Sequence, residues 1–90
     1  MIFDLSFEGY LNWINDLRAA VREDPCEHNV RRLAEIMNLC IVQSDRDEAE
    51  KYGLLMEGIY WHLHLYYAYG NPKDLERAES IDSYRNFGMF

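Results

Sequence analysis

The sequence contains no threonine, and its isoleucines and valines together number only nine among 90 residues. Residues that favour strands are therefore scarce apart from the aromatics, whereas helix-favouring leucine, alanine, glutamate, arginine and methionine are plentiful. Helix-breaking proline occurs only at Pro25 and Pro72. This composition predicts an all-α fold.

Other features that the sequence lacks exclude several classes of protein. No run approaches the roughly 18–20 apolar residues that span a bilayer, and the N-terminal segment lacks the basic region of a signal peptide. Two cysteines, Cys26 and Cys40, are too few for a disulfide scaffold. We therefore expect no membrane association and a reduced, cytoplasmic setting.

Positive charge is also in short supply, because 16 acidic residues oppose nine basic ones and leave a net charge of −7. Direct binding to nucleic acid or to an anionic membrane requires a basic face, so the charge argues against both. It permits a partner protein with a basic or nucleic-acid-binding surface. The apolar share of 49% predicts a folded chain, and its length predicts one domain.

Four helices are predicted from apolar residues that recur at spacings of three and four. Their expected bounds are about 6–23, 25–43, 45–69 and 72–84. Asp24 is expected to cap the second helix with Pro25 at its first position, and Gly70 to cap the third at its C-terminus. The predicted fold over 1–90 is a small bundle of three long helices and a shorter C-terminal one, with antiparallel up-down topology. An apolar tail follows over 86–90.

The most distinctive stretch runs from Tyr60 to Tyr69, where five aromatics and two of the three histidines are concentrated. Two apolar seams along the third helix predict neighbours on both sides of it. We expect Tyr60, Trp61 and Leu63 to complete the core. Leu65–Tyr69 should project beyond the other long helices, where the fourth helix, the tail or a partner must cover them.

The residues that could carry chemistry do not form a known catalytic or metal-binding pattern. His62 and His64 would point about 200° apart on a helix and so cannot share a metal ion. Cys26 is open as a reactive thiol, but His28, two residues later, faces another way. Phosphate loops, nucleophile elbows and helical metalloprotease motifs are lacking. We expect no enzymatic activity and no cofactor.

Acidic residues form three groups along the chain, of which the second lies near the expected start of the third helix: Glu23, Asp24 and Glu27; Asp45, Asp47, Glu48 and Glu50; and Asp74, Glu76, Glu79 and Asp82. Such a cluster suggests a protein that mimics nucleic acid and occupies a DNA- or RNA-binding surface. Capping and the helix dipole also favour acids in a first helical turn. Mimicry therefore stays open as an alternative.

The segment from Leu65 to Ala78 resembles the helix-turn-helix junction of Sel1/tetratricopeptide-like repeats, which bind proteins. It covers about a sixth of the chain and has no second copy. A single repeat cannot bury its own faces, so the resemblance does not assign the chain to that family.

The leading functional hypothesis is a non-enzymatic, small, acidic protein-binding module. A stoichiometric inhibitor or antagonist fits this profile, for example a phage anti-defence protein or an immunity or antitoxin protein. The candidate partner-binding residues combine the aromatic end of the third helix, where tyrosine and tryptophan suit binding hot spots, with the acidic cluster. They are Trp61, His64, Tyr66, Tyr67, Tyr69, Asp45, Asp47, Glu48 and Glu50. A structural bundle that forms homodimers through its aromatic end is a further alternative.

Overall fold

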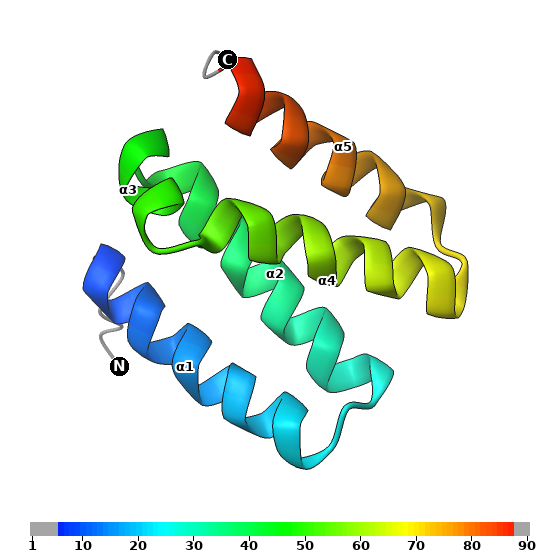
Figure 1. Ribbon diagram of the computed structural model, residues 1–90. Coiled ribbons are helices and arrows are strands. Elements are labelled where there is room, and N and C mark those ends of the chain that lie inside the picture. Colours follow the sequence, from blue (N-terminus) through cyan, green and yellow to red (C-terminus); the bar gives the residue numbers. More distant parts are fainter. Residues whose placement is uncertain (1–5, 88–90) are drawn as a thin grey trace.

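The computed structural model describes residues 6–87, and the regular structure of this part of the chain is entirely helical (Figure 1). The all-α class is therefore confirmed for the described residues. The helices are α1 (Phe7–Glu23), α2 (Glu27–Gln43), α3 (Arg46–Lys51), α4 (Leu54–Tyr69) and α5 (Pro72–Phe87). None of these helices is long and apolar enough to cross a bilayer.

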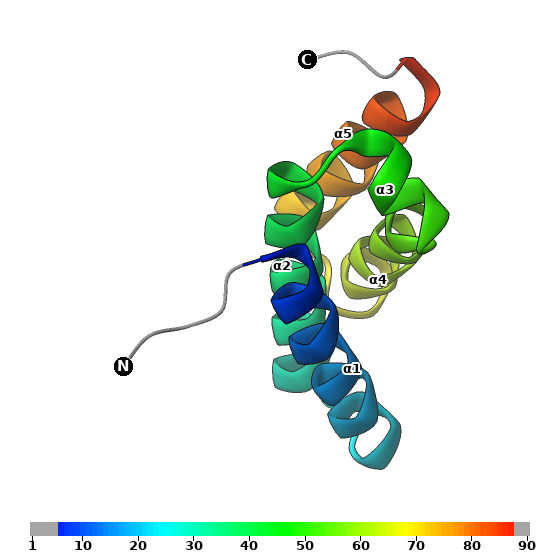
Figure 2. The ribbon, with the colours of Figure 1, turned by 90° about the vertical axis from the view of Figure 1, so that its left-hand side faces the viewer.

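The longer helices form two hairpins that meet through α2 and α4. α1 packs along α2, α5 packs along α4, and α2 lies against α4 (Figures 1 and 2). The short helix α3 sits at the junction and contacts α2, α4 and α5. Large, fully buried apolar side chains from α1, α2 and α4 fill the space between them: Ile14, Leu33, Met37, Leu54, Leu55 and Leu65.

The turn between α1 and α2 differs from the predicted one. Asp24 is extended (φ −146°, ψ 94°), and its N–H donates to the Ala20 carbonyl at 2.9 Å, so it ends α1. The prediction that Asp24 caps the second helix with Pro25 at its first position is wrong. A residue before proline is pushed towards extended geometry, and α2 begins only at Glu27, with Cys26 as its N-cap.

The predicted helix over 45–69 is wrong in its continuity, because the chain divides it into α3 and α4. α3 ends at Lys51, and Gly53 adopts the left-handed conformation (φ 73°) that precedes α4. Glycine enters this region without the steric cost that other residues carry. The break allows α4 to take a direction of its own (Figure 2).

The C-terminal helix is longer than predicted. Gly70 caps α4 as expected, with a left-handed φ of 77° and its N–H donating to the Tyr66 carbonyl at 2.8 Å. α5 has 16 residues, the same length as α4, so the prediction of a shorter C-terminal helix over 72–84 is wrong. The first two residues of the predicted tail, 86–90, belong to α5, and 88–90 lie outside the described residues.

Gly58 lies where α4 packs tightly against two neighbouring helices. A Cβ placed there would lie 3.2 Å from Ile41 Cδ1 of α2 and 3.2 Å from Ile81 Cδ1 of α5. The absent side chain therefore lets both helices approach α4 at one point, through side chains rather than backbone. Among residues 6–87, no helix packs against the opposite side of α4 (Figure 2).

Candidate functional site

α4 has the composition of a helix that is buried on every side. Glu57 is the single charged residue among its 16. A helix that is apolar around its whole circumference normally has neighbours around its whole circumference. In this protein only one side is fully buried, and its residues are Leu54, Leu55, Gly58, His62 and Leu65.

The opposite side of α4 carries a strip of exposed apolar and aromatic side chains. Met56, Tyr60, Leu63 and Tyr67 are spaced by four, three and four residues, which aligns them along one side of a helix. Met56 is 56% exposed, Tyr60 59% and Tyr67 78%, while Leu63 is half-buried. Exposed His64 borders the strip, with its ring centroid 6.5 Å from that of Tyr60. These five residues are called the α4 face below.

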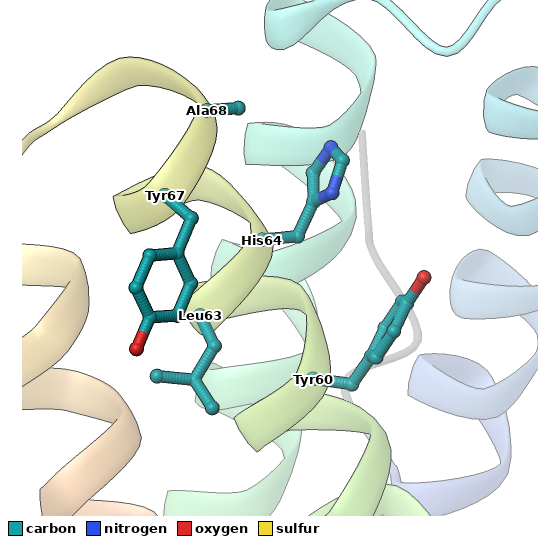
Figure 3. A pocket seen from close by; sticks show the side chains of 5 residues that line it. All are labelled: Tyr60, Leu63, His64, Tyr67 and Ala68. Carbon is teal, nitrogen blue, oxygen red and sulfur yellow. The ribbon is translucent and has the colours of Figure 1, made fainter.

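The α4 face is hollowed at its centre. Tyr60, Leu63, His64, Tyr67 and Ala68 line a shallow, largely apolar hollow of about 450 Å³ (Figure 3). The side chains of Leu63 and Tyr67 point to one side of α4 and those of Tyr60 and His64 to the other, so the hollow lies between two rows of side chains (Figure 3). An apolar side chain of another molecule would enter this hollow without displacing any charge.

The one charge on α4 is engaged with α1 rather than free. The Arg18 guanidinium donates through Nε to Glu57 Oε2 at 3.0 Å and through Nη2 to Oε1 at 2.5 Å. Trp61 Nε1 donates to the same carboxylate at 3.1 Å, which holds the half-buried indole at the edge of the α4 face. Because a two-pronged guanidinium–carboxylate contact is strong and directional, the face presents no unpaired charge of its own.

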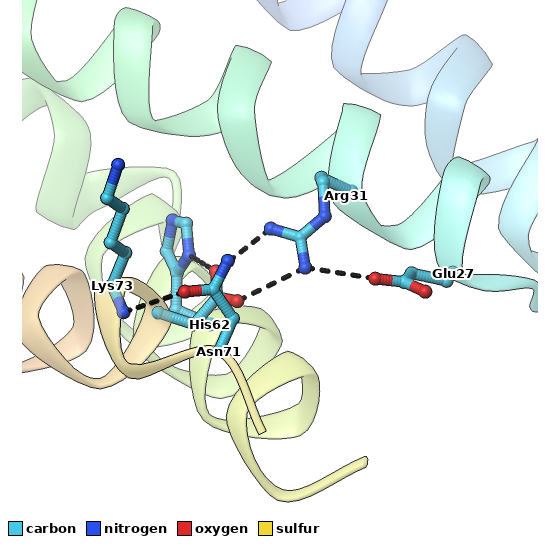
Figure 4. A network of polar contacts seen from close by, with 6 residues as sticks. Glu27, Arg31, His62, Asn71 and Lys73 are labelled. Atoms are coloured by element: carbon cyan, nitrogen blue, oxygen red, sulfur yellow. Dashed lines mark hydrogen bonds and ion pairs between the residues drawn. The ribbon is translucent and has the colours of Figure 1, made fainter. Parts of the chain in front are cut away.

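A buried polar network lies on the other side of α4 (Figure 4). Asp74 of α5 is 1% exposed and accepts from Arg31 Nη2 of α2 at 3.2 Å. His62 of α4, which is fully buried, contacts Asp74 Oδ1 through Nδ1 at 3.2 Å. Arg31 also donates to exposed Glu27 at 3.3 Å. The network thus ties α2, α4 and α5 together.

The electrostatics of this network keep His62 neutral near pH 7. Burial lowers the pKa of His62, and the charges of Arg77 and Arg31 add to the lowering, whereas Asp74 raises it less. A neutral ring donates from Nδ1 to Asp74, and Nε2 has no hydrogen-bond partner among the described residues. Burial works to lower the pKa of Arg31, but hydrogen bonds to Asp74 and Glu27 outweigh it and raise that pKa.

This network was not predicted from the sequence. Asp74 lies in the first turn of α5, where acids are common, but its carboxylate is buried. From the sequence, His62 was considered as a metal ligand. A signal was present, because His62 follows Gly58 by four residues and precedes Leu65 by three, which places it on the buried seam.

The described residues form no group of three or more histidine, cysteine, aspartate or glutamate side chains that could hold a metal ion. His62 is buried while His64 is exposed, so the two imidazoles lie apart. Cys26 and Cys40 are both free. Burial, with a smaller effect from Glu48, raises the pKa of the Cys40 thiol to about 11, so that thiol stays protonated.

One prediction about the aromatic stretch is wrong. Tyr60 was assigned to the core but is 59% exposed. Leu65, which was expected to need cover from the fourth helix, the tail or a partner, is fully buried within the single chain. The physical reason is that α2 and α5 both pack against one side of α4 and leave the opposite side, which holds Tyr60, exposed. The regular spacing from Met56 through Tyr60 to Tyr67 was the available sign of a second, exposed side.

The structure brings together only part of the predicted partner-binding aromatic group. His64 and Tyr67 lie on the α4 face, and Trp61 lies at its edge. Tyr66 is half-buried, with its ring 5.2 Å from that of Tyr67. Tyr69 is 44% exposed but lines a separate polar pocket beside the network of Figure 4.

The acidic part of the predicted site stands apart from these aromatics. Its four members are all exposed and lie on or next to α3: Asp45, Asp47, Glu48 and Glu50. The side chain of Asp47 is 92% exposed, with Arg46 Nη2 at 3.5 Å from its Oδ1. Since α3 precedes α4, this acidic group flanks the N-terminal end of the α4 face instead of mixing with it.

Comparisons of the chain with protein-family models, with curated proteins and with solved structures found no match. The function proposed below rests on the α4 face and its surroundings.

Proposed function

We propose that the protein is a non-enzymatic, acidic protein-binding module and that the α4 face is its docking surface. The observation that carries this proposal is the mismatch between α4 and its surroundings. The helix is apolar on all sides, yet Met56, Tyr60 and Tyr67 are more than half exposed. Contiguous exposed patches of this kind mark interaction sites more often than they occur on unpartnered surfaces.

The bare area is large enough to matter for binding. A tyrosine side chain can bury about 200 Å², so Tyr60 and Tyr67 together leave on the order of 270 Å² uncovered. Because full burial of one large apolar side chain contributes about 1.5–3 kcal/mol, covering these two partly exposed rings would contribute a few kcal/mol before the costs of association. Tyrosine is also enriched among hot-spot residues, because it combines a large ring with a hydroxyl.

The acidic group beside α3 supports a partner whose own surface is basic near the docking site. Asp47 and its acidic neighbours lie at the N-terminal end of the α4 face and are exposed to solvent. Charges at the rim of an interface mainly raise the association rate and orient the encounter. We therefore retain the narrower hypothesis of a stoichiometric inhibitor or antagonist that approaches a basic partner.

We propose an up-down bundle as the frame that presents this face. Short connections join α1 to α2 and α4 to α5, which favours antiparallel neighbours in each pair. In such a frame α2 and α5 occupy one side of α4 and leave the other to a partner.

Affinity capture from the cells that make the protein tests the proposed function. The baits are the wild type, the double variant Tyr60→Ser/Tyr67→Ser, and Val42→Ser as a matched control. Val42 is 73% exposed on α2, so its replacement removes apolar surface of similar exposure away from the α4 face.

The wild type and Val42→Ser should each retain a stoichiometric protein, which can include an untagged copy of the chain itself. The double variant should bind that protein at least about 30-fold more weakly, the equivalent of a 2 kcal/mol hot spot. Equal retention by the double variant, or no stoichiometric protein with any bait, would contradict the proposal.

A further inference from the structure

We infer that the occupant of the α4 face is a second copy of this chain, bound through antiparallel pairing of the two α4 helices. The inference rests on the proposed function only in that the α4 face is a docking surface; it replaces the basic partner suggested above with a second copy of the chain.

The hollow has the sequence spacing of a helix-packing hole. Four of the residues that line it, Tyr60, Leu63, His64 and Tyr67, are at positions i, i+3, i+4 and i+7 of one helix. Four residues at this spacing form the hole that receives one side chain, the knob, from a facing helix in knobs-into-holes packing. The geometry therefore points to a helix as the occupant.

The strip has the spacing of one side of a helix pair. Met56, Tyr60, Leu63 and Tyr67 follow one another at four, three and four residues, as the a and d positions of a heptad repeat do. A partner helix laid along this strip would meet an apolar side chain at every layer.

The order of these side chains is self-complementary when one helix is reversed. The strip reads aliphatic, aromatic, aliphatic, aromatic from Met56 to Tyr67. In an antiparallel pair Met56 of one copy meets Tyr67 of the other, and Tyr60 meets Leu63. Each layer then sets a ring against an aliphatic side chain, including a favourable sulfur–aromatic contact. Tyr60 of each copy becomes the knob that enters the hollow of the other.

Two-fold symmetry requires this reciprocity, because a residue that contacts a second residue across the axis must be contacted by it in return. The four layers satisfy the requirement without any unpaired position. A parallel arrangement would instead place each residue against its own copy, and the hollow beside Leu63 would not receive Tyr60.

The distribution of charge also selects this face for contact between identical chains. Each copy carries a net charge of −7, so contact through acidic surfaces would bring like charges together. On the α4 face there is no free charge, because Glu57 is held by Arg18. Antiparallel pairing also directs the acidic group of one copy towards the α4–α5 turn of the other, where Lys73 is exposed.

Sedimentation velocity of the full chain over a wide range of concentration tests the inference. We expect the wild type to approach twice the chain mass of 10.8 kDa and to dissociate on dilution. Tyr60→Glu and Tyr67→Glu should remain monomeric with unchanged helical circular dichroism, because both side chains are exposed in the single chain. Val42→Glu, at a similarly exposed position on α2, should still form dimers.

The antiparallel register is tested by mixing two variants. Tyr60→Glu alone and Leu63→Lys alone should each be monomeric, since each buries an unpaired charge in two layers of its own dimer. An equimolar mixture should recover the dimer. In the mixed pair the carboxylate introduced by Tyr60→Glu meets the ammonium introduced by Leu63→Lys in one layer, and the wild-type contact between tyrosine and leucine returns in the other.

A wild type that stays monomeric at every concentration would overturn the inference, and so would a dimer that survives Tyr60→Glu or a mixture that stays monomeric. The proposed function fails separately. If the wild type is a monomer but captures a different protein that Tyr60→Ser/Tyr67→Ser loses, the docking surface stands and only the second copy is excluded.

Discussion

Asp74 is the residue at which three helices meet. Its carboxylate is buried and accepts from Arg31 of α2 and from His62 of α4, while its own backbone belongs to α5. A buried carboxylate is costly to desolvate unless its oxygens are hydrogen-bonded. The network therefore fixes the position of α5, and with it the side of α4 that remains open.

The energetic role of Asp74 can be measured against a matched control. Asp74→Asn should lower the free energy of unfolding by about 2–3 kcal/mol, because the amide has one accepting oxygen and no charge to pair with partly buried Arg31. Glu27→Gln removes the other, exposed partner of Arg31 and should cost under about 0.5 kcal/mol. Urea unfolding measures both, and equal losses would contradict the assigned role.

His62 predicts a dependence of stability on pH. Its pKa is lowered in the folded protein, so the unfolded chain takes up the proton first as the pH falls. The contribution of neutral His62 to the free energy of unfolding is fully present above the ordinary histidine pKa of about 6.5. It is lost as the pH drops from there towards the lower pKa of His62 in the folded protein. The slope over that range should reach at most about 1.4 kcal/mol per pH unit, the limit for one proton.

His62→Asn supplies the control for this dependence. An asparagine amide nitrogen can take the place of Nδ1 and donate to Asp74, but it does not titrate. At pH 7.5 the free energy of unfolding of the variant should be lower than that of the wild type. The part of its pH dependence that begins just below about pH 6.5, the ordinary histidine pKa, should be absent. Urea midpoints that fall equally steeply in the wild type and in His62→Asn would show that another group causes the slope.

The break between α3 and α4 sets the direction of the α4 helix. The sequence favoured one continuous helix because no breaker pair occurs between Ser44 and Gly70. Glycine within a helical pattern lowers helix propensity by only about 1 kcal/mol, so propensity alone does not locate a break. Gly53 has a left-handed φ at the break, and beyond it α4 packs against α2. Local sequence patterns do not report such long-range packing.

Gly53→Ala distinguishes the broken helix from the continuous one by the sign of its effect. With the observed φ of 73°, a Cβ adds left-handed strain, and the free energy of unfolding should fall by about 1 kcal/mol. If residues 45–69 formed one helix, the same change would stabilise it by about 1 kcal/mol. Urea unfolding followed by far-ultraviolet circular dichroism gives the sign, and a stabilised variant would contradict the break.

Local sequence rules predict some parts of the fold and of the candidate site, and other parts depend on packing between helices. Helical class, the α1–α2 and α4–α5 boundaries near Pro25 and Pro72, and the αL cap at Gly70 follow from local rules, and they were predicted to within a few residues. The exposed side of α4 does not follow from them. An all-round apolar helix has no polar stripe to mark its outer side, so Tyr60 was assigned to the core although it is exposed.

Across the whole molecule, the two sides of α4 differ in what covers them. α2 and α5 close on one side of α4 at Gly58 and at the Arg31–Asp74–His62 network. The other side of α4 is left as an uncharged aromatic strip on a chain of net charge −7. In general a net charge far from zero opposes non-specific association, whereas an exposed apolar patch is typical of an interaction site.

Hydroxyl-radical footprinting of Tyr60 and Tyr67 tests the docking role of the α4 face most directly, whatever covers it. The dilute, purified chain is compared with the same chain at native abundance in extract of the cells that make it, with Leu39 of α2 (46% exposed) as the internal reference. We predict that both tyrosines are modified in the dilute chain and protected in the extract, while Leu39 is modified alike in both. Equal modification of Tyr60 and Tyr67 in the two samples would contradict the claim that this face is a docking surface.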